Sequence, residues 1–167
     1  VATESIRWNA FSMVGVGPEI NVPYEVDEYG KVASYRARQI VIDNSVVTEM
    51  VAFNGDLSKI GFLKDDNTAI VHRLRPNGST LIIGSGGGRD ILVALANGQQ
   101  DIQAVEVNPL VVRLADEDFR EFTGQVYSRQ GVQKVVGDAR SYIANSSESF
   151  DVILATLIDT WAASAAG

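Results

Sequence analysis

A glycine-rich turn is the first stretch of this sequence whose residue types suit ligand binding. Gly84-Ser85-Gly86-Gly87-Gly88 stands between a short apolar run and a helical pattern. Glycines let the backbone approach a ligand closely and adopt positive φ, and a helix N-terminus adds N–H donors and a positive dipole end. Tight packing of a strand against a helix explains such a turn equally well. Alone, the turn is therefore a weak signal for a phosphate or a nucleoside.

Two carboxylates follow the turn at spacings that would complete a nucleoside site. Glu106 lies 18 residues after Gly88, and an acid at that distance can accept hydrogen bonds from both ribose hydroxyls. Asp138, followed by Ala139, ends the next predicted strand, where it could accept from an adenine amino group. Singly, Glu106 could be a solvated strand end and Asp138 a helix cap. Their joint occurrence, each at the carboxyl end of its own strand, favours a nucleoside ligand.

The spacing of the glycines separates two kinds of nucleotide ligand. A dinucleotide fingerprint reads G-x-G-x-x-G, and its last position falls here on Arg89. The chain instead has the shorter Gly84-x-Gly86-x-Gly88, which is typical of adenosylmethionine-binding domains that have no pyrophosphate to hold. Asp138 also suits that class better. The pattern therefore predicts an adenosyl group without pyrophosphate, with a dinucleotide as the weaker alternative.

The elements that must position these residues alternate between strand and helix after residue 78. Short apolar runs indicate strands buried in a parallel sheet, and Asn108-Pro109 supplies an N-cap with proline at the first helical position. Strand-helix-strand repeats imply parallel pairing with right-handed crossovers. Strands are predicted at 80–83, 102–107, 132–136 and 150–155, and helices at 90–97, 108–122 and 140–145.

Residues 1–75 have a different, β-rich pattern. Strands are expected at 36–42 and 45–53 around an Asp43-Asn44 turn, and at 6–16 and 21–26 around Gly17-Pro18, with a helical end at 69–74. The predicted fold class is α/β: a small N-terminal β-rich segment over 1–75, then the first half of a Rossmann-like, adenosylmethionine-binding domain over 76–167. The parallel sheet would be truncated after its fourth strand. Its exposed edge favours a homo-oligomer.

Composition narrows the classes of partner. The 167 residues carry a formal net charge of −7, which disfavours nucleic acid, and no basic stripe offsets it. Cysteine is absent, and no cluster of histidines or carboxylates predicts a metal. No apolar run approaches the roughly 18 residues of a membrane span. Both ends look cut, so we expect a cytoplasmic piece or the soluble part of a membrane-anchored protein, without membrane contact of its own.

Several motifs together resemble the spermidine synthase (polyamine aminopropyltransferase) family. Residues 81–88 look like its first nucleotide loop, 105–109 are similar to its V-E-I-D-P, and 136–140 to its G-D-G/A-R. Residues 150–154 match its fourth strand, and 40–44 resemble its N-terminal hairpin. The resemblance implies a transferase of the class I methyltransferase fold that uses S-adenosylmethionine or its decarboxylated form as cosubstrate and a small-molecule acceptor. The implied nucleoside contacts are Gly84, Ser85, Gly86, Gly87, Gly88, Asp90, Glu106, Val107, Asp138 and Ala139.

The sequence departs from the family pattern at two acids. The family's first loop has an acid where this chain has Gly87, and Asp90 could replace it or simply favour the helix N-terminus. The family also has a base directly after the fourth strand, in D-x-x-D-P, which we match to Ala155. Asp159 lies nearby and is the candidate catalytic residue, displaced into that role.

Three functions therefore remain open. The first is a spermidine synthase-like transfer of an aminopropyl group to a polyamine, for which loss of the base is a difficulty. The second is methyl transfer, which needs no general base when its acceptor is already nucleophilic. The third is a non-catalytic nucleoside-binding domain of a larger protein. The piece alone is not expected to complete a reaction, since the acceptor pocket should lie beyond Asp159.

Overall fold

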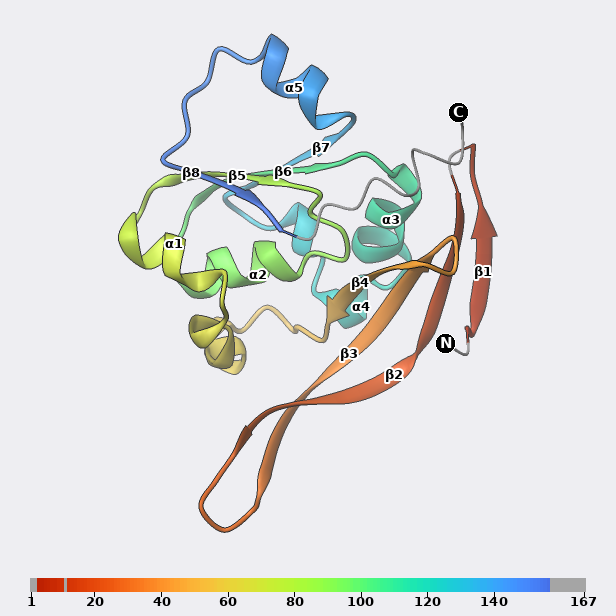
Figure 1. Ribbon diagram of the computed structural model, residues 1–167, viewed down its shortest axis with the longest axis vertical. Helices are drawn as coiled ribbons and strands as arrows, with labels where there is room; N and C mark the ends of the chain where they lie inside the picture. The colour runs from red at the N-terminus through yellow and green to blue at the C-terminus, as the bar shows by residue number, and fades with distance from the viewer. Residues whose placement is uncertain (1–2, 11, 157–167) are drawn as a thin grey trace.

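The chain forms two four-stranded sheets with helical segments packed between them (Figure 1). The computed structural model describes residues 3–10 and 12–156. The first sheet is antiparallel in the order β1-β2-β3-β4, and the second is parallel in the order β7-β6-β5-β8. An α/β fold with a β-rich N-terminal segment is thus confirmed. The antiparallel strands are β1 (Ser5–Trp8), β2 (Met13–Val26), β3 (Val32–Ile42) and β4 (Val46–Val51).

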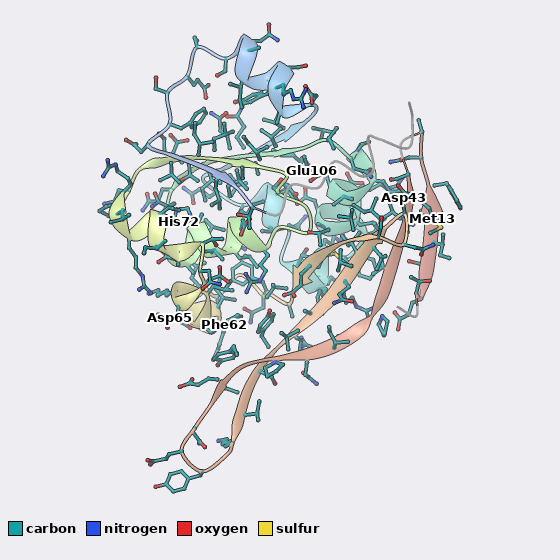
Figure 2. All side chains as sticks on the ribbon, in the orientation of Figure 1. Met13, Asp43, Phe62, Asp65, His72 and Glu106 are labelled. Carbon is teal, nitrogen blue, oxygen red and sulfur yellow. The ribbon has the colours of Figure 1, made fainter. Side chains whose placement is uncertain are left out.

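The tight turn between β3 and β4 forms where the sequence predicts it. Asp43 and Asn44 both have positive φ, 49° and 56°, as a two-residue hairpin turn that follows the sheet twist requires. The Asp43 side chain also accepts a hydrogen bond from the Met13 N–H at 2.8 Å, which ties the turn to the start of β2 (Figure 2). The turn that joins β3 to β4 is thus also bonded to β2.

The predicted break at Gly17-Pro18 is wrong. β2 runs through both residues, and its pairing with β3 shifts register between Val16 and Glu19. Such a bulge accommodates a proline, which has no N–H to donate to the ladder. The predicted strand at 6–16 is instead split into β1 and the start of β2. The resulting long β2–β3 hairpin extends away from the rest of the molecule in Figure 1.

The parallel sheet follows the predicted alternation. Its order places β5 in the centre, with β6 and β7 on one side and β8 on the other. The strand order therefore reverses at the boundary between β5 and β8, because β6 and β7 are added on one side of β5 and β8 on the other. In Figure 1, α5 lies on one side of this sheet and α2 on the other. The elements are β5 (Ser79–Ile83), α2 (Arg89–Ala96), β6 (Asp101–Glu106), α3 (Pro109–Arg113), β7 (Val132–Val136), α5 (Ala139–Asn145) and β8 (Val152–Ala155).

The single helix predicted at 108–122 is divided. Asn108 does cap α3, with its Oδ1 accepting from the Leu110 N–H at 3.1 Å. A π-helical turn η2 (Leu114–Asp118) then widens the helix before α4 (Arg120–Thr123) and the 3-10 turn η3 (Val126–Ser128). The Thr123 hydroxyl donates to the Ala115 carbonyl at 2.5 Å, so a side chain satisfies a carbonyl in the widened turn.

One continuous hydrophobic core joins the two sheets. Met50 and Ile40 of the antiparallel sheet are buried in the same cluster as Ile82 of β5 and Ile91 of α2. The 3-10 segment η1 (Leu57–Asp65) and the helix α1 (Ala69–Leu74), predicted as a helical end, connect β4 to β5 and add buried residues to this cluster. Among the described residues, no helix is both long enough and apolar enough to span a bilayer.

Acid is expected to destabilise the protein through His72, which is only 1% exposed. Neither of its ring nitrogens has a hydrogen-bond partner among the described residues, and burial lowers its pKa. The unfolded chain then binds the proton more readily, so His72 contributes stability above pH about 6.5 that is lost as the pH falls. His72 should contribute at most about 1.4 kcal/mol to the loss of stability that urea unfolding measures between pH 7.5 and 5.5. The variant His72→Leu should lose less; equal losses in both would contradict this role.

Candidate active site

The predicted site residues lie at the carboxyl ends of three neighbouring strands. The glycine turn follows β5, Glu106 ends β6, and Asp138 follows β7. Figure 2 shows Glu106 between the parallel sheet and the antiparallel sheet. Within the turn, Gly86 and Gly88 have φ of 52° and 93°, so both positions need glycine for their backbone conformation.

The backbone N–H groups of the turn are all bonded within the protein. Those of Gly84 and Ser85 donate to the Val105 carbonyl at 2.9 and 3.1 Å, and that of Gly88 donates to Ser85 at 2.9 Å. The Gly86 N–H donates to Glu106 Oε2 at 2.9 Å, and the Gly87 N–H donates to Thr48 Oγ1 at 2.8 Å. The N–H groups of residues 84–88 are therefore used by β4, β6 and the turn itself.

Three of the glycines are required by packing. A Cβ on Gly86 would lie 2.2 Å from Thr48 Oγ1, and one on Gly87 would lie 2.2 Å from the Glu49 carbonyl oxygen. A Cβ on Gly88 would meet Val126 Cγ1 at 2.5 Å. These residues and Ser85 are buried, whereas Gly84 is exposed. The turn thus packs against β4 and η3, and Gly84 is its exposed member.

Glu106 is buried and holds the start of the next loop. Only 7% of the residue is exposed, and its carboxylate accepts from the N–H groups of Gly86 and Asn108, each at 2.9 Å. Burial raises the pKa of this carboxyl, and the backbone N–H groups of Asn108, Gly86 and Val107 partly offset that rise. A carboxylate offers about four acceptor positions, so these N–H groups leave capacity for a further donor. The adjacent Val107 is 54% exposed.

Asp138 caps a helix. Its Oδ1 accepts from the Ser141 N–H at 2.8 Å and from the Ser141 hydroxyl at 2.9 Å, and these bonds hold the pKa of Asp138 below its usual value. The side chain is exposed beyond the end of β7, and Ala139 follows as the first residue of α5. Capping does not exclude a second contact, because Oδ2 is a separate acceptor.

Asp90 lies in the first turn of α2, facing the end of β8. Its carboxylate bonds with the Thr156 side chain and lies 3.4 Å from Thr68 Oγ1, and burial raises its pKa. Because β8 ends at Ala155, the residue directly after the fourth strand is Thr156, not Ala155 as matched from the sequence. A D-x-x-D spacing counted back from Asp159 also reaches Thr156. Neither position holds an acid, and Asp159 lies outside the described residues.

Sequence reasoning missed four hydrogen bonds at the site. Tyr127, which is buried, places its hydroxyl 2.9 Å from Ser85 Oγ and donates to the Gly86 carbonyl at 2.5 Å. Thr48 bonds Gly87, and Asn108 donates to Ser12 Oγ at 2.8 Å. These partners are some 40 to 96 residues apart in the chain, and no local pattern marks them.

A cleft of about 610 Å³ lies beside the start of α2. Phe62 stacks between Tyr24 and Tyr35, with ring centroids 4.7 and 4.6 Å away, and these rings form one wall. Figure 2 labels Phe62 and Asp65 at this position. Arg89 pairs with Asp66 within the cleft. The charged residues of its lining are Glu25, Asp65, Asp66 and Arg89, a net negative set. Across the described part of the chain, no three histidines or carboxylates are grouped so as to hold a metal ion.

The strand order β7-β6-β5-β8 places the glycine turn and the two acids at the carboxyl ends of three neighbouring parallel strands. Two solved structures with a similar fold are spermidine synthases. One, in complex with the transition state analogue AdoDATO, has a TM-score of 0.58 and 16% identity. Another, from Thermotoga maritima, has a TM-score of 0.60 and 17% identity. They match 92% of this chain, which covers 46% and 47% of theirs.

Sequence comparison points the same way. The chain is 28% identical over 80 residues to "Polyamine aminopropyltransferase 2" of Hyperthermus butylicus, a match that covers 47% of this chain and 26% of that relative. The sequence matches no protein-family model. The chain thus spans about a quarter of the curated relative and somewhat less than half of the solved chains. Together the two comparisons support a spermidine synthase-like family, and the observed fold is similar to part of the spermidine synthase fold.

Proposed function

We propose that this chain is the adenosyl-binding part of a spermidine synthase-like transferase. Gly84, Glu106 and Asp138 would hold S-adenosylmethionine, its decarboxylated form or the methylthioadenosine product. The observation that carries the proposal is the placement of these residues at the carboxyl ends of β5, β6 and β7. They lie beside the reversal between β5 and β8, which is the place where open α/β sheets bind ligands.

The hydrogen bonding of the turn favours an adenosyl ligand over a dinucleotide. A pyrophosphate is usually held by free backbone N–H groups of a glycine turn at a helix N-terminus. Here the N–H groups of Gly84 to Gly88 bond to other protein atoms. A nucleoside without phosphates needs acceptors for its hydroxyls and amino group instead, and Glu106 and Asp138 are acceptors.

The cleft beside α2 supports an amine as the acceptor. Its tyrosine and phenylalanine rings and its excess of carboxylates suit an organic cation. An amine attacks the sulfonium carbon only when it has lost its proton, so aminopropyl transfer needs a nearby base. In this proposal Asp159 serves as that base, and Asp90, which bonds with Thr156 directly after β8, is a second acid close to it in the fold.

Methyl transfer is the second candidate, and a specific observation favours it. The residue directly after β8 is Thr156, so a carboxylate is missing where the family has its base. A methyltransferase whose acceptor is already nucleophilic does not need that group.

A homo-oligomer in the cytoplasm is also part of the proposal. Ile6 and Trp8 of the edge strand β1 are 55% and 73% exposed, and exposed apolar edge strands favour association. Light scattering on the full-length protein should give a mass above that of one chain; a monomeric mass would reject this part.

Titration of the full-length protein tests the ligand class. Calorimetry should detect binding of S-adenosylmethionine, its decarboxylated form or methylthioadenosine, and no binding of NAD. If a folded protein bound none of the adenosyl compounds, both proposed transferase functions would fail.

With decarboxylated S-adenosylmethionine and putrescine, Asp159→Asn should lower turnover by a factor of about 100 or more, the usual contribution of a general base. Undiminished turnover would reject Asp159, and methylation without aminopropyl transfer would select the second candidate.

A further inference from the structure

The nucleoside turn is held by a residue of the antiparallel sheet, and we propose that this residue, Thr48 of β4, is a positioning residue for the adenosyl site. Through its bond to Gly87, the conformation of the turn comes to depend on the N-terminal sheet. The inference rests on the proposed function, because it concerns the ligand that the turn and Glu106 would bind.

The contact between Thr48 and the turn is direct. Thr48 Oγ1 lies 2.8 Å from the Gly87 nitrogen and accepts its hydrogen bond. Gly87 is buried, so loss of the Thr48 hydroxyl would leave this N–H without its partner. The missing Cβ atoms of Gly86 and Gly87 let the strand come this close, since each Cβ would lie 2.2 Å from an atom of β4.

The next residue in the turn carries the effect to the ribose acceptor. Gly86 precedes Gly87, and its N–H donates to Glu106 Oε2 at 2.9 Å. The N–H groups of two consecutive residues therefore bond to different parts of the molecule. That of Gly87 bonds to the antiparallel sheet, and that of Gly86 bonds to Glu106, the acid expected to bind the ribose. The Gly87 N–H and the Gly86 carbonyl belong to one peptide unit, and the Gly86 N–H belongs to the unit before it. A shift of Gly87 therefore reaches the bond to Glu106 through the backbone dihedrals of Gly86.

The other bonds that fix the turn come from the parallel-sheet part of the chain. Tyr127 bonds Ser85 and Gly86, and Val105 accepts from Gly84 and Ser85. Thr48 is thus the side chain through which β4 bonds to the turn. Because coupling between two sites is reciprocal, a ligand that orders the turn must also stabilise β4.

Two substitutions in the full-length protein separate the hydroxyl from the volume of the side chain. Thr48→Val keeps the shape and removes the acceptor, whereas Thr48→Ser keeps the acceptor. Calorimetry with 5′-methylthioadenosine should show about tenfold weaker binding for Thr48→Val and a change of less than about threefold for Thr48→Ser, as loss of one buried hydrogen bond predicts. Ligand-induced slowing of amide exchange in β4 should persist in Thr48→Ser and disappear in Thr48→Val.

The outcomes distinguish this inference from the proposed function. If the wild-type protein binds no adenosyl compound, the proposed function fails and the inference fails with it. If the wild type binds and Thr48→Val binds equally well, Thr48 has no positioning role although the proposed function stands. Should Thr48→Val fail to fold, amide exchange in the wild type decides. If the ligand slows amide exchange more in residues 46–51 than in the hairpin tip at 24–32, the inference is supported. Equal slowing of amide exchange in the two segments overturns it.

Discussion

Replacing Glu106 with alanine should weaken the binding of methylthioadenosine by about 1–3 kcal/mol, because a charge-assisted pair of hydrogen bonds to the ribose is lost. The same change removes the acceptor for the Gly86 and Asn108 N–H groups, so the turn and the following loop also lose an anchor. Calorimetry on the full-length protein measures the affinity. Unchanged affinity would show that Glu106 is structural only.

The pH dependence of binding offers a second test of Glu106. Its carboxylate accepts hydrogen bonds when ionised, and burial raises its pKa. Affinity should therefore decline as the pH falls, beginning at a higher pH than an ordinary glutamate would give. Glu117→Ala is the matched control, because that exposed side chain makes only a long ion pair, 3.8 Å, with Arg113. This control should keep both the wild-type affinity and the wild-type pH profile.

Restoring the family's acid in the first loop should harm the protein. In Gly87→Asp, the new Cβ would lie 2.2 Å from the Glu49 carbonyl oxygen and 2.9 Å from the Met50 nitrogen, and backbone atoms cannot move aside cheaply. We expect a loss of about 3 kcal/mol in the free energy of unfolding, at the upper end for overpacking. Urea denaturation checks this value. Ligand affinity should fall rather than rise.

A matched glycine separates this clash from the general cost of adding an aspartate. Gly137 also lacks positive φ, and a Cβ placed on it meets nothing within 4 Å. Gly137→Asp should therefore change the free energy of unfolding by less than about 1 kcal/mol. A small effect at Gly87 would mean that β4 can move away from the turn, and an equal effect at Gly137 would mean that the loss is a general cost of the aspartate.

The sequence was sufficient for the elements that carry their own local signals. The β5 run followed by glycines, Asn108-Pro109 at the start of α3, and Asp43-Asn44 between β3 and β4 each predict a boundary from neighbouring residues. The order of Glu106 and Asp138 along the chain then places both at one edge of the sheet, because parallel strands share that edge. The architecture around the site followed from these few signals.

What could not be predicted depends on contacts between remote segments. Nothing near Gly87 in the sequence shows that Thr48 occupies its N–H, or that the space an acid would need is taken by Glu49. Gly17-Pro18 likewise reads as a break, and only pairing with β3 turns it into a bulge. The end of β8 was equally hard to predict, because Ala155 is the last residue of the strand and Thr156 is the first residue after it.

The central position of β5 has a consequence for the newborn chain. Its Thr80 pairs with Val152 of β8, which the ribosome makes 72 residues later (152 − 80). At about 5–20 residues per second, one edge of the central strand remains unpaired for roughly 4–14 s during synthesis. An open apolar strand edge recruits other strands, so this interval is when a chaperone would be of most use.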